Sequence, residues 1–116
     1  MQVEIYPLEI KLDRSKKKLF ILFSNKKKYS ITSELLRIES PSAEVQGHGG
    51  PKVFVINKQD VEIVDIETVG NYAIKIIFSD GHNTGIYTWE KLFDFALNQK
   101  HILKEYREKL KNHLQF

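Results

Sequence analysis

The spacing of apolar residues changes at Thr88 from that of strands to that of a long helical stretch, and this change restricts the fold more than any other feature. Before Thr88, apolar residues at every second position from Tyr72 to Phe78 indicate a strand with one buried face. After it, the apolar residues fall on one face of a helix: Trp89, Leu92, Phe93, Ala96 and Leu97. Strands followed by helices predict an α+β domain, an antiparallel or mixed β-sheet packed in two layers by helices, with C-terminal helices last.

The remaining elements follow from the same patterns. Leu19–Phe23 is apolar on both faces, which is typical of a central strand covered on both sides. Val61–Val69 slips once in phase, which predicts a β-bulge, and Asp80-Gly81 predicts a hairpin turn. Ser33 is expected to cap a short helix. Further strands are predicted at residues 8–12, 29–31, 52–56 and 84–87.

The length of 116 residues supports a single domain. We expect residues 1–97 to form it and residues 98–116 to add an amphipathic helical extension. Asn98-Gln99 weakens the helical pattern between the two stretches and predicts two helices. The apolar side of the second one carries Leu103, Tyr106, Leu110 and Leu114.

The net charge of +3 is distributed unevenly. Residues 1–58 contain 11 Lys/Arg and six Asp/Glu, against seven and nine in residues 59–116. The basic excess lies in Lys16–Lys18 and Lys26–Lys28, which we interpret as solvated strand ends. Neither run contains arginine or interleaved aromatic residues, so nucleic acid is not the expected partner.

Several classes of protein are excluded or disfavoured by what the sequence lacks. Without cysteine, the chain has no disulfide, thiolate nucleophile or cysteine zinc site. No apolar run has the roughly 18 residues of a membrane helix, and Met1–Glu4 does not resemble a secretion signal, so a cytoplasmic location is expected.

Catalytic patterns are also missing. The four histidines show neither metal-site spacing nor a facial triad, and no serine elbow or P-loop occurs, so we expect no enzyme and no cofactor. His101 and His113 are expected at the surface. Residues 39–51 read as a glycine-rich loop around His48, which leaves a small anion or ligand binder as one alternative.

Four segments in fixed order resemble the gamma-butyrobetaine hydroxylase-like N-terminal domain family, over about residues 5–97. They are Leu35–Glu44, Gly47–Gly49, Val69–Ala73 and Phe78–Trp89. Bacterial members of this family are often short proteins of unknown function. In the hydroxylases a similar domain precedes an oxygenase domain, and elsewhere it is joined to an iron–sulfur carrier; this chain shows neither an oxygenase triad nor a P-loop.

The resemblance also implies a zinc site. By position, the three zinc cysteines of the hydroxylase domain map to Ser40, Ser42 and Val45, and the histidine maps to His82. Because serine and valine are poor donors, we predict that the site is lost, that no metal is bound, and that the serines hydrogen-bond within the loop, including to His82.

We therefore expect a non-catalytic interaction or accessory module with an unknown protein partner. The alternative is an accessory that docks to an iron–sulfur carrier or another metal-delivery protein. The candidate interaction surface consists of Arg37, Ser40, Ser42, Glu44, His48, Asp80 and His82.

Overall fold

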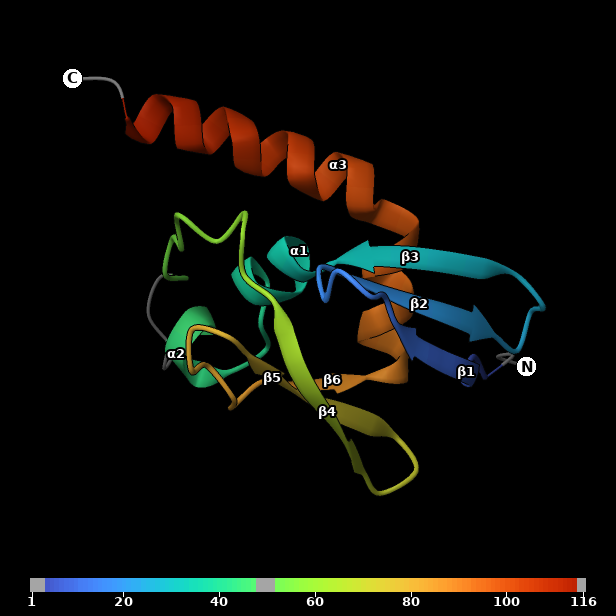
Figure 1. The fold of residues 1–116 in the computed structure, drawn as a ribbon. Coiled ribbons are helices and arrows are strands. Elements are labelled where there is room, and N and C mark those ends of the chain that lie inside the picture. Colours follow the sequence, from blue (N-terminus) through green and yellow to red (C-terminus); the bar gives the residue numbers. More distant parts are fainter. Residues whose placement is uncertain (1–3, 48–51, 115–116) are drawn as a thin grey trace.

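The computed structural model describes residues 4–47 and 52–114, and it contains two three-stranded antiparallel sheets and one long helix (Figure 1). The first sheet pairs β1 (Pro7–Leu12), β2 (Lys18–Phe23) and β3 (Lys28–Thr32) in that order. The second pairs β4 (Ile63–Val69), β5 (Ala73–Phe78) and β6 (Ile86–Thr88) in that order. The α+β class is confirmed, with two sheets in place of the single sheet expected.

Strand β2 lies at the centre of the first sheet, as predicted, but only one of its faces is covered. Leu19, Ile21 and Phe23 are buried, whereas Phe20 between them is 43% exposed. The prediction of cover on both sides was wrong, because an apolar residue on each face does not tell which face another layer will occupy.

The second sheet follows its sequence pattern closely. The register of β4 against β5 shifts between Ile63 and Asp65, so the predicted bulge is confirmed. The returning strand β6 begins at Ile86, whereas the sequence predicted a start at residue 84. The start is later because residues 79–85 form a broad loop and not a tight hairpin turn. Gly81 adopts a φ of 91°, which suits glycine in this loop.

Two short helices, α1 (Ser33–Ile38) and α2 (Ala43–Gln46), lie between the sheets in the chain order. Thr32, and not Ser33, caps α1: its Oγ1 accepts the N–H of Leu35 at 3.1 Å. The hydroxyl of Ser33 instead donates to the buried carbonyl of Val61 at 2.6 Å. Helix α2 is a single helical turn inside the segment that was predicted to be a loop, residues 39–51.

The last element, α3 (Trp89–His113), is a single helix where two were predicted. Thr88 caps it as expected, accepting from Lys91 N at 3.2 Å. Gln99 does not break the helix because its side chain bonds the edge of β3, accepting from Thr32 N at 2.9 Å and donating to Ser30 O at 2.7 Å. The terminal extension is thus the second half of α3.

Residues 52–56 form no strand, contrary to prediction. Phe54 in this segment instead packs against the second half of α3, with its ring centroid 5.5 Å from that of Tyr106. The hydroxyl of Tyr106 donates to Val55 O at 2.8 Å, and Arg107 holds Glu34 of α1 through bonds of 2.7 and 2.9 Å. Residues 52–56 therefore find contacts on helix α3 and do not pair with another strand.

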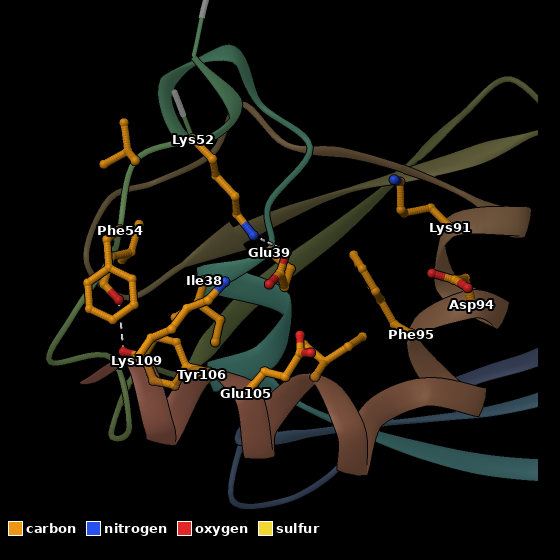
Figure 2. Close-up of a pocket in the computed structure, with 13 residues that line it drawn as sticks. Ile38, Glu39, Lys52, Phe54, Lys91, Asp94, Phe95, Glu105, Tyr106 and Lys109 are labelled. Carbon is orange, nitrogen blue, oxygen red and sulfur yellow. Dashed lines mark hydrogen bonds and ion pairs between the residues drawn. The ribbon is translucent and has the colours of Figure 1, made fainter. Parts of the chain in front are cut away.

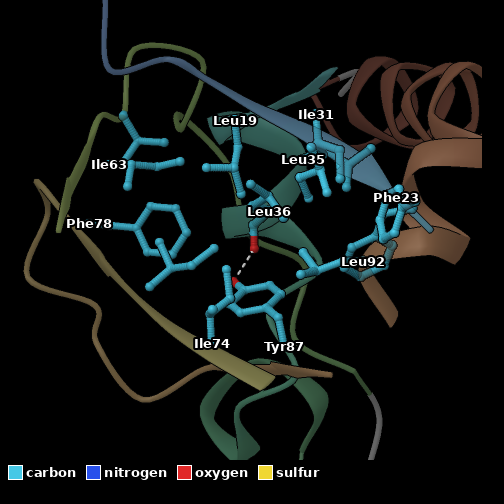
Figure 3. Packing of buried hydrophobic residues seen from close by; sticks show 14 residues of the cluster. Leu19, Phe23, Ile31, Leu35, Leu36, Ile63, Ile74, Phe78, Tyr87 and Leu92 are labelled. Atoms are coloured by element: carbon cyan, nitrogen blue, oxygen red, sulfur yellow. Dashed lines mark hydrogen bonds between the residues drawn. The ribbon is translucent and has the colours of Figure 1, made fainter. Parts of the chain in front are cut away.

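The core joins both sheets to α1 and the first half of α3 (Figure 3). Tyr87 is fully buried there and donates to Leu36 O, and burial raises the pKa of its hydroxyl. The labelled core residues are Leu19, Phe23, Ile31, Leu35, Leu36, Ile63, Ile74, Phe78, Tyr87 and Leu92. In the described part of the chain, no helix is long and apolar enough to cross a membrane.

Candidate functional site

Two loops that are distant in sequence meet beside the core: residues 39–42 after α1, and residues 79–85 between β5 and β6. Each is shaped by its own hydrogen bonds. Asp80 Oδ1 accepts from His82 N at 3.1 Å, and Phe78 N donates to His82 O at 3.0 Å. Gln46 Nε2 donates to Ser40 O at 2.8 Å. These local bonds set the positions from which the side chains of the two loops meet.

The side chains that meet form a polar cluster of Ser40, Ser42, Glu44 and His82. Nε2 of His82 lies 2.8 Å from Ser40 Oγ and 3.3 Å from Ser42 Oγ, while Nδ1 lies 3.2 Å from Glu44 Oε2. Ser40, Ser42 and His82 are buried, whereas the side chain of Glu44 is 67% exposed. The predicted hydrogen bonds between the serines and His82 are confirmed.

The electrostatics of the polar cluster assign the protons. Burial and the charge of Arg37 lower the pKa of His82, against the opposing effects of Glu44 and Asp80, so the imidazole is neutral at pH 7. A carboxylate only accepts hydrogen bonds, so Nδ1 donates its proton to Glu44. Nε2 is then the acceptor for the hydroxyl of Ser40, with Ser42 as the more distant donor.

Gly85 closes the polar cluster from the side of β6. A Cβ at this position would collide with Ser40 Oγ and crowd the ring of Tyr87. Only glycine allows the backbone to approach the serine this closely. The close approach leaves Ser40 with no exposed surface.

Asp80 connects the polar cluster to the rest of the molecule. Its Oδ2 accepts from Arg37 Nε at 2.8 Å and from Lys58 Nζ at 2.7 Å. Burial alone would raise the pKa of Asp80, but Lys58, the N–H of His82 and Arg37 outweigh it and lower the pKa to about 2. One buried atom of Arg37, Nη1, has no partner among the described residues.

The order Ser40–His82–Glu44 has the contacts of a hydrolytic triad, but it lacks access. Ser40 is fully buried against Gly85, so a substrate carbonyl cannot reach its hydroxyl in this arrangement. The donor set also does not fit structural zinc, which takes four thiolate, imidazole or carboxylate ligands. Two neutral hydroxyls, one imidazole and the buried, apolar Val45 stand at the positions implied by the resemblance.

The structure thus brings together Arg37, Ser40, Ser42, Asp80 and His82, with Glu44 at their exposed side. The remaining predicted residue, His48, lies outside the described residues. Sequence reasoning did not identify Lys58 or Gly85. Gly85 lies inside the Phe78–Trp89 segment of the resemblance, which was a usable signal; Lys58 has no distinctive sequence context. His101 and His113 are exposed, as predicted.

A separate cavity of about 480 Å³ lies between residues 52–55 and α3 (Figure 2). Apolar and aromatic side chains, including Phe54, Phe95 and Tyr106, line it together with three lysines and three acidic residues. Lys52 and Glu39, which both line the cavity, form an ion pair, as the dashed line in Figure 2 shows. The charged lining residues are Glu39, Lys52, Lys91, Asp94, Glu105 and Lys109.

Residues 10–93 match the family model described as gamma-butyrobetaine hydroxylase-like, N-terminal. The chain belongs to this family. Comparison with curated proteins gives no significant match.

Solved structures similar to this family member include two NMR solution structures. The first is 42% identical, with a TM-score of 0.80, and the match covers 96% of this chain and 85% of the other. The second is 38% identical, with a TM-score of 0.78 and coverage of 90% and 83%. A crystal structure of a DUF971 family protein of unknown function from Acidithiobacillus ferrooxidans is 37% identical, with a TM-score of 0.62 and coverage of 74% and 86%.

Proposed function

We propose that this domain is a non-catalytic accessory module that binds a protein partner, and that a hydrogen-bonded polar cluster replaces the zinc site of related domains. The observation that carries the proposal is that Ser40, Ser42 and His82 satisfy one another's hydrogen bonds inside the protein. Their polar atoms bond one another, and the residues are buried. Groups arranged in this way stabilise a loop and are not available to a substrate.

The partner surface in this proposal is the rim of the polar cluster. Glu44 is its most exposed side chain, and its carboxylate is oriented by the bond to His82 Nδ1. Arg37, Lys58 and Asp80 neutralise part of one another's charge beside it. The rim therefore presents an oriented carboxylate on a fixed loop, which suits recognition by a cationic group on a partner.

Reversing the charge of Glu44 tests the partner surface. We expect Glu44→Lys to lower recovery of the partner in affinity purification from the native cell by about tenfold, as for loss of an interfacial charge pair. Glu90→Lys, at an exposed acidic residue on α3, is the matched control and should leave recovery unchanged. Equal recovery with Glu44→Lys and wild type would refute this surface.

Metal analysis tests the loss of zinc directly. The wild-type chain, refolded with zinc and then dialysed, should retain far less than one equivalent, because its donors at this site include one imidazole and two neutral hydroxyls. Retention of about one equivalent that is lost in His82→Ala would overturn the proposal.

The cavity between residues 52–55 and α3 favours a second candidate function, the binding of a small ligand. Its volume of about 480 Å³ lies within the range of small-molecule sites. An aromatic lining with balanced charges suits an amphipathic zwitterion. A thermal-shift screen of zwitterionic amphiphiles should find a ligand whose stabilisation disappears in Phe54→Ala and persists in Phe20→Ala; an absence of any shift would count against it.

A further inference from the structure

The outer face of the first sheet combines exposed lysines with an exposed aromatic ring, and the proposed function does not use it. We call Lys11, Lys18, Phe20, Leu22 and Lys28 the lysine–phenylalanine face. A groove of about 220 Å³ runs over it, lined by Glu9, Lys11, Phe20, Ile21, Leu22 and Lys28. The face is unlike the opposite side of the sheet, which is part of the core.

Strand alternation places these side chains together. Because Leu19, Ile21 and Phe23 are buried, the residues between them point outward from β2. The register then pairs Lys11 of β1 with Phe20, and Leu22 with Lys28 of β3. Lys11 therefore lies directly opposite Phe20, and Lys18 and Lys28 lie two residues along the strands from it and from its partner Ser30.

The charge of this region is strongly positive. Residues 4–32 contain eight Lys/Arg and three Asp/Glu, whereas the rest of the chain has more acidic than basic residues. Glu9 is the one acidic residue that lines the groove, and it pairs with Lys11 at 3.1 Å. Within residues 4–47 and 52–114, Lys18 and Lys28 form no ion pair.

We propose that the lysine–phenylalanine face binds single-stranded nucleic acid. An exposed aromatic ring offers a stacking surface to any unpaired base, and lysines on either side neutralise the adjoining phosphates. Sequence reasoning disfavoured nucleic acid because the lysine runs lack interleaved aromatic residues; the fold supplies one, since Phe20 lies beside lysines in space. The lysine–phenylalanine face contains no arginine, which fits binding without base specificity.

Other occupants fit this face less well. The apolar residues that line its groove are Phe20, Ile21 and Leu22, a patch too small to seat an amphipathic helix or to insert into a membrane. A second copy of this chain would place two strongly basic faces against each other. Base stacking requires only one ring, and the positive charge then becomes favourable.

Fluorescence anisotropy with labelled oligodeoxythymidine of about 12 nucleotides tests the stacking contact. We expect Phe20→Leu to weaken binding by roughly tenfold, since loss of one base–aromatic stack has an effect of this size. Tyr72→Leu, at an exposed aromatic residue on the β4–β5 turn, is the matched control and should bind like wild type. Equal affinity of wild type and Phe20→Leu would overturn the proposal.

The lysines are tested by the salt dependence of the same binding. The double variant Lys11→Gln, Lys28→Gln should reduce the slope of log affinity against log salt by about 1.4, or 0.7 per phosphate contact. The matched double variant of exposed α3 lysines, Lys100→Gln, Lys104→Gln, should leave it unchanged. Glu9→Gln should strengthen binding, because it removes the one competing carboxylate.

Competition identifies the class of occupant. A duplex of the same length should compete poorly, because its bases are already stacked. A polyglutamate peptide or phosphatidylserine vesicles that displaced the oligonucleotide at lower concentration than unlabelled oligodeoxythymidine would reject nucleic acid in favour of an acidic protein or a membrane. Absence of any binding at about 50 mM salt would reject the proposal outright.

Discussion

The polar cluster and the lysine–phenylalanine face differ in whether their groups have partners inside the molecule. Ser40, Ser42 and His82 hold the residue types of catalysis, yet their polar atoms bond one another and are buried. Phe20 and Lys28 are not residue types that indicate catalysis, but both are exposed and can contact a partner molecule. The comparison shows that residue type alone is a weak guide to function, and that internal satisfaction of polar groups separates a structural cluster from a binding surface.

The largest expected effect converts the polar cluster into a metal site. The triple variant Ser40→Cys, Ser42→Cys, Val45→Cys should bind about one equivalent of zinc, because three thiolates would join the imidazole of His82 in a tetrahedral set. Folding and zinc binding would then be coupled, so the midpoint of thermal unfolding should rise with zinc and fall with a chelator.

A control separates this site from adventitious metal. The same triple variant carrying His82→Ala should bind zinc more weakly, since only three designed ligands remain. Zinc binding with equal affinity in both variants, or no binding in either, would show that these four positions do not form the site that the resemblance implies.

The next largest effect is loss of stability when the polar cluster is broken. His82→Ala leaves the hydroxyls of Ser40 and Ser42 without their acceptor and opens a cavity, so we expect a loss of about 3 kcal/mol in the free energy of unfolding. Urea denaturation measures it. His101→Ala, at an exposed histidine, is the control and should change stability by less than about 0.5 kcal/mol. Comparable losses in both variants would contradict a structural role specific to His82.

Acid should weaken the polar cluster in two windows of pH. The pKa of His82 is lowered in the folded state. Its contribution to the free energy of unfolding is therefore complete above the unfolded pKa of about 6.5 and is lost as the pH falls below that value. The pKa of Asp80 is about 2 against an unfolded value of 3.8, so its contribution is lost as pH falls from about 4 to about 2.

Urea unfolding at a series of pH values measures both windows. The total loss between about pH 4 and 2 attributable to Asp80 should be about 2 kcal/mol, and Asp80→Asn should remove that part of the pH dependence. His82→Ala should remove the part that begins near pH 6.5. A variant that retained the wild-type profile in its own window would show that other groups control acid unfolding.

The sequence pattern predicted local structure well where one face of an element is buried. The alternation is present from Ile74 to Phe78, although Tyr72 lies in the preceding turn and is 53% exposed, and Thr88 caps α3 as predicted. It failed where a distant partner decides the outcome. Gln99 continues a helix because it bonds the edge of β3, and residues 52–56 meet α3 instead of a strand.

The candidate site shows the same division. The bonds from Ser40 and Ser42 to His82 could be expected because the family resemblance places all three residues at ligand positions of one zinc site. Sequence spacing alone would not have paired them, since His82 lies 42 and 40 residues after the two serines. The contact of Lys58 with Asp80 joins the irregular segment before β4 to the β5–β6 loop, and no periodicity predicts such a pair. The exposure of Phe20 depends on which face of the first sheet α3 covers, and this is a property of the whole fold.

The smallest expected effect concerns the stability of the lysine–phenylalanine face. Phe20→Leu should change the free energy of unfolding by less than about 0.5 kcal/mol, because its ring is 43% exposed and lies outside the buried cluster. Urea denaturation alongside Phe23→Leu, at the buried neighbour, supplies the contrast, with an expected loss above about 1 kcal/mol. A large loss in Phe20→Leu would mean that Phe20 serves the sheet itself, and the two regions would then differ less than their exposure implies.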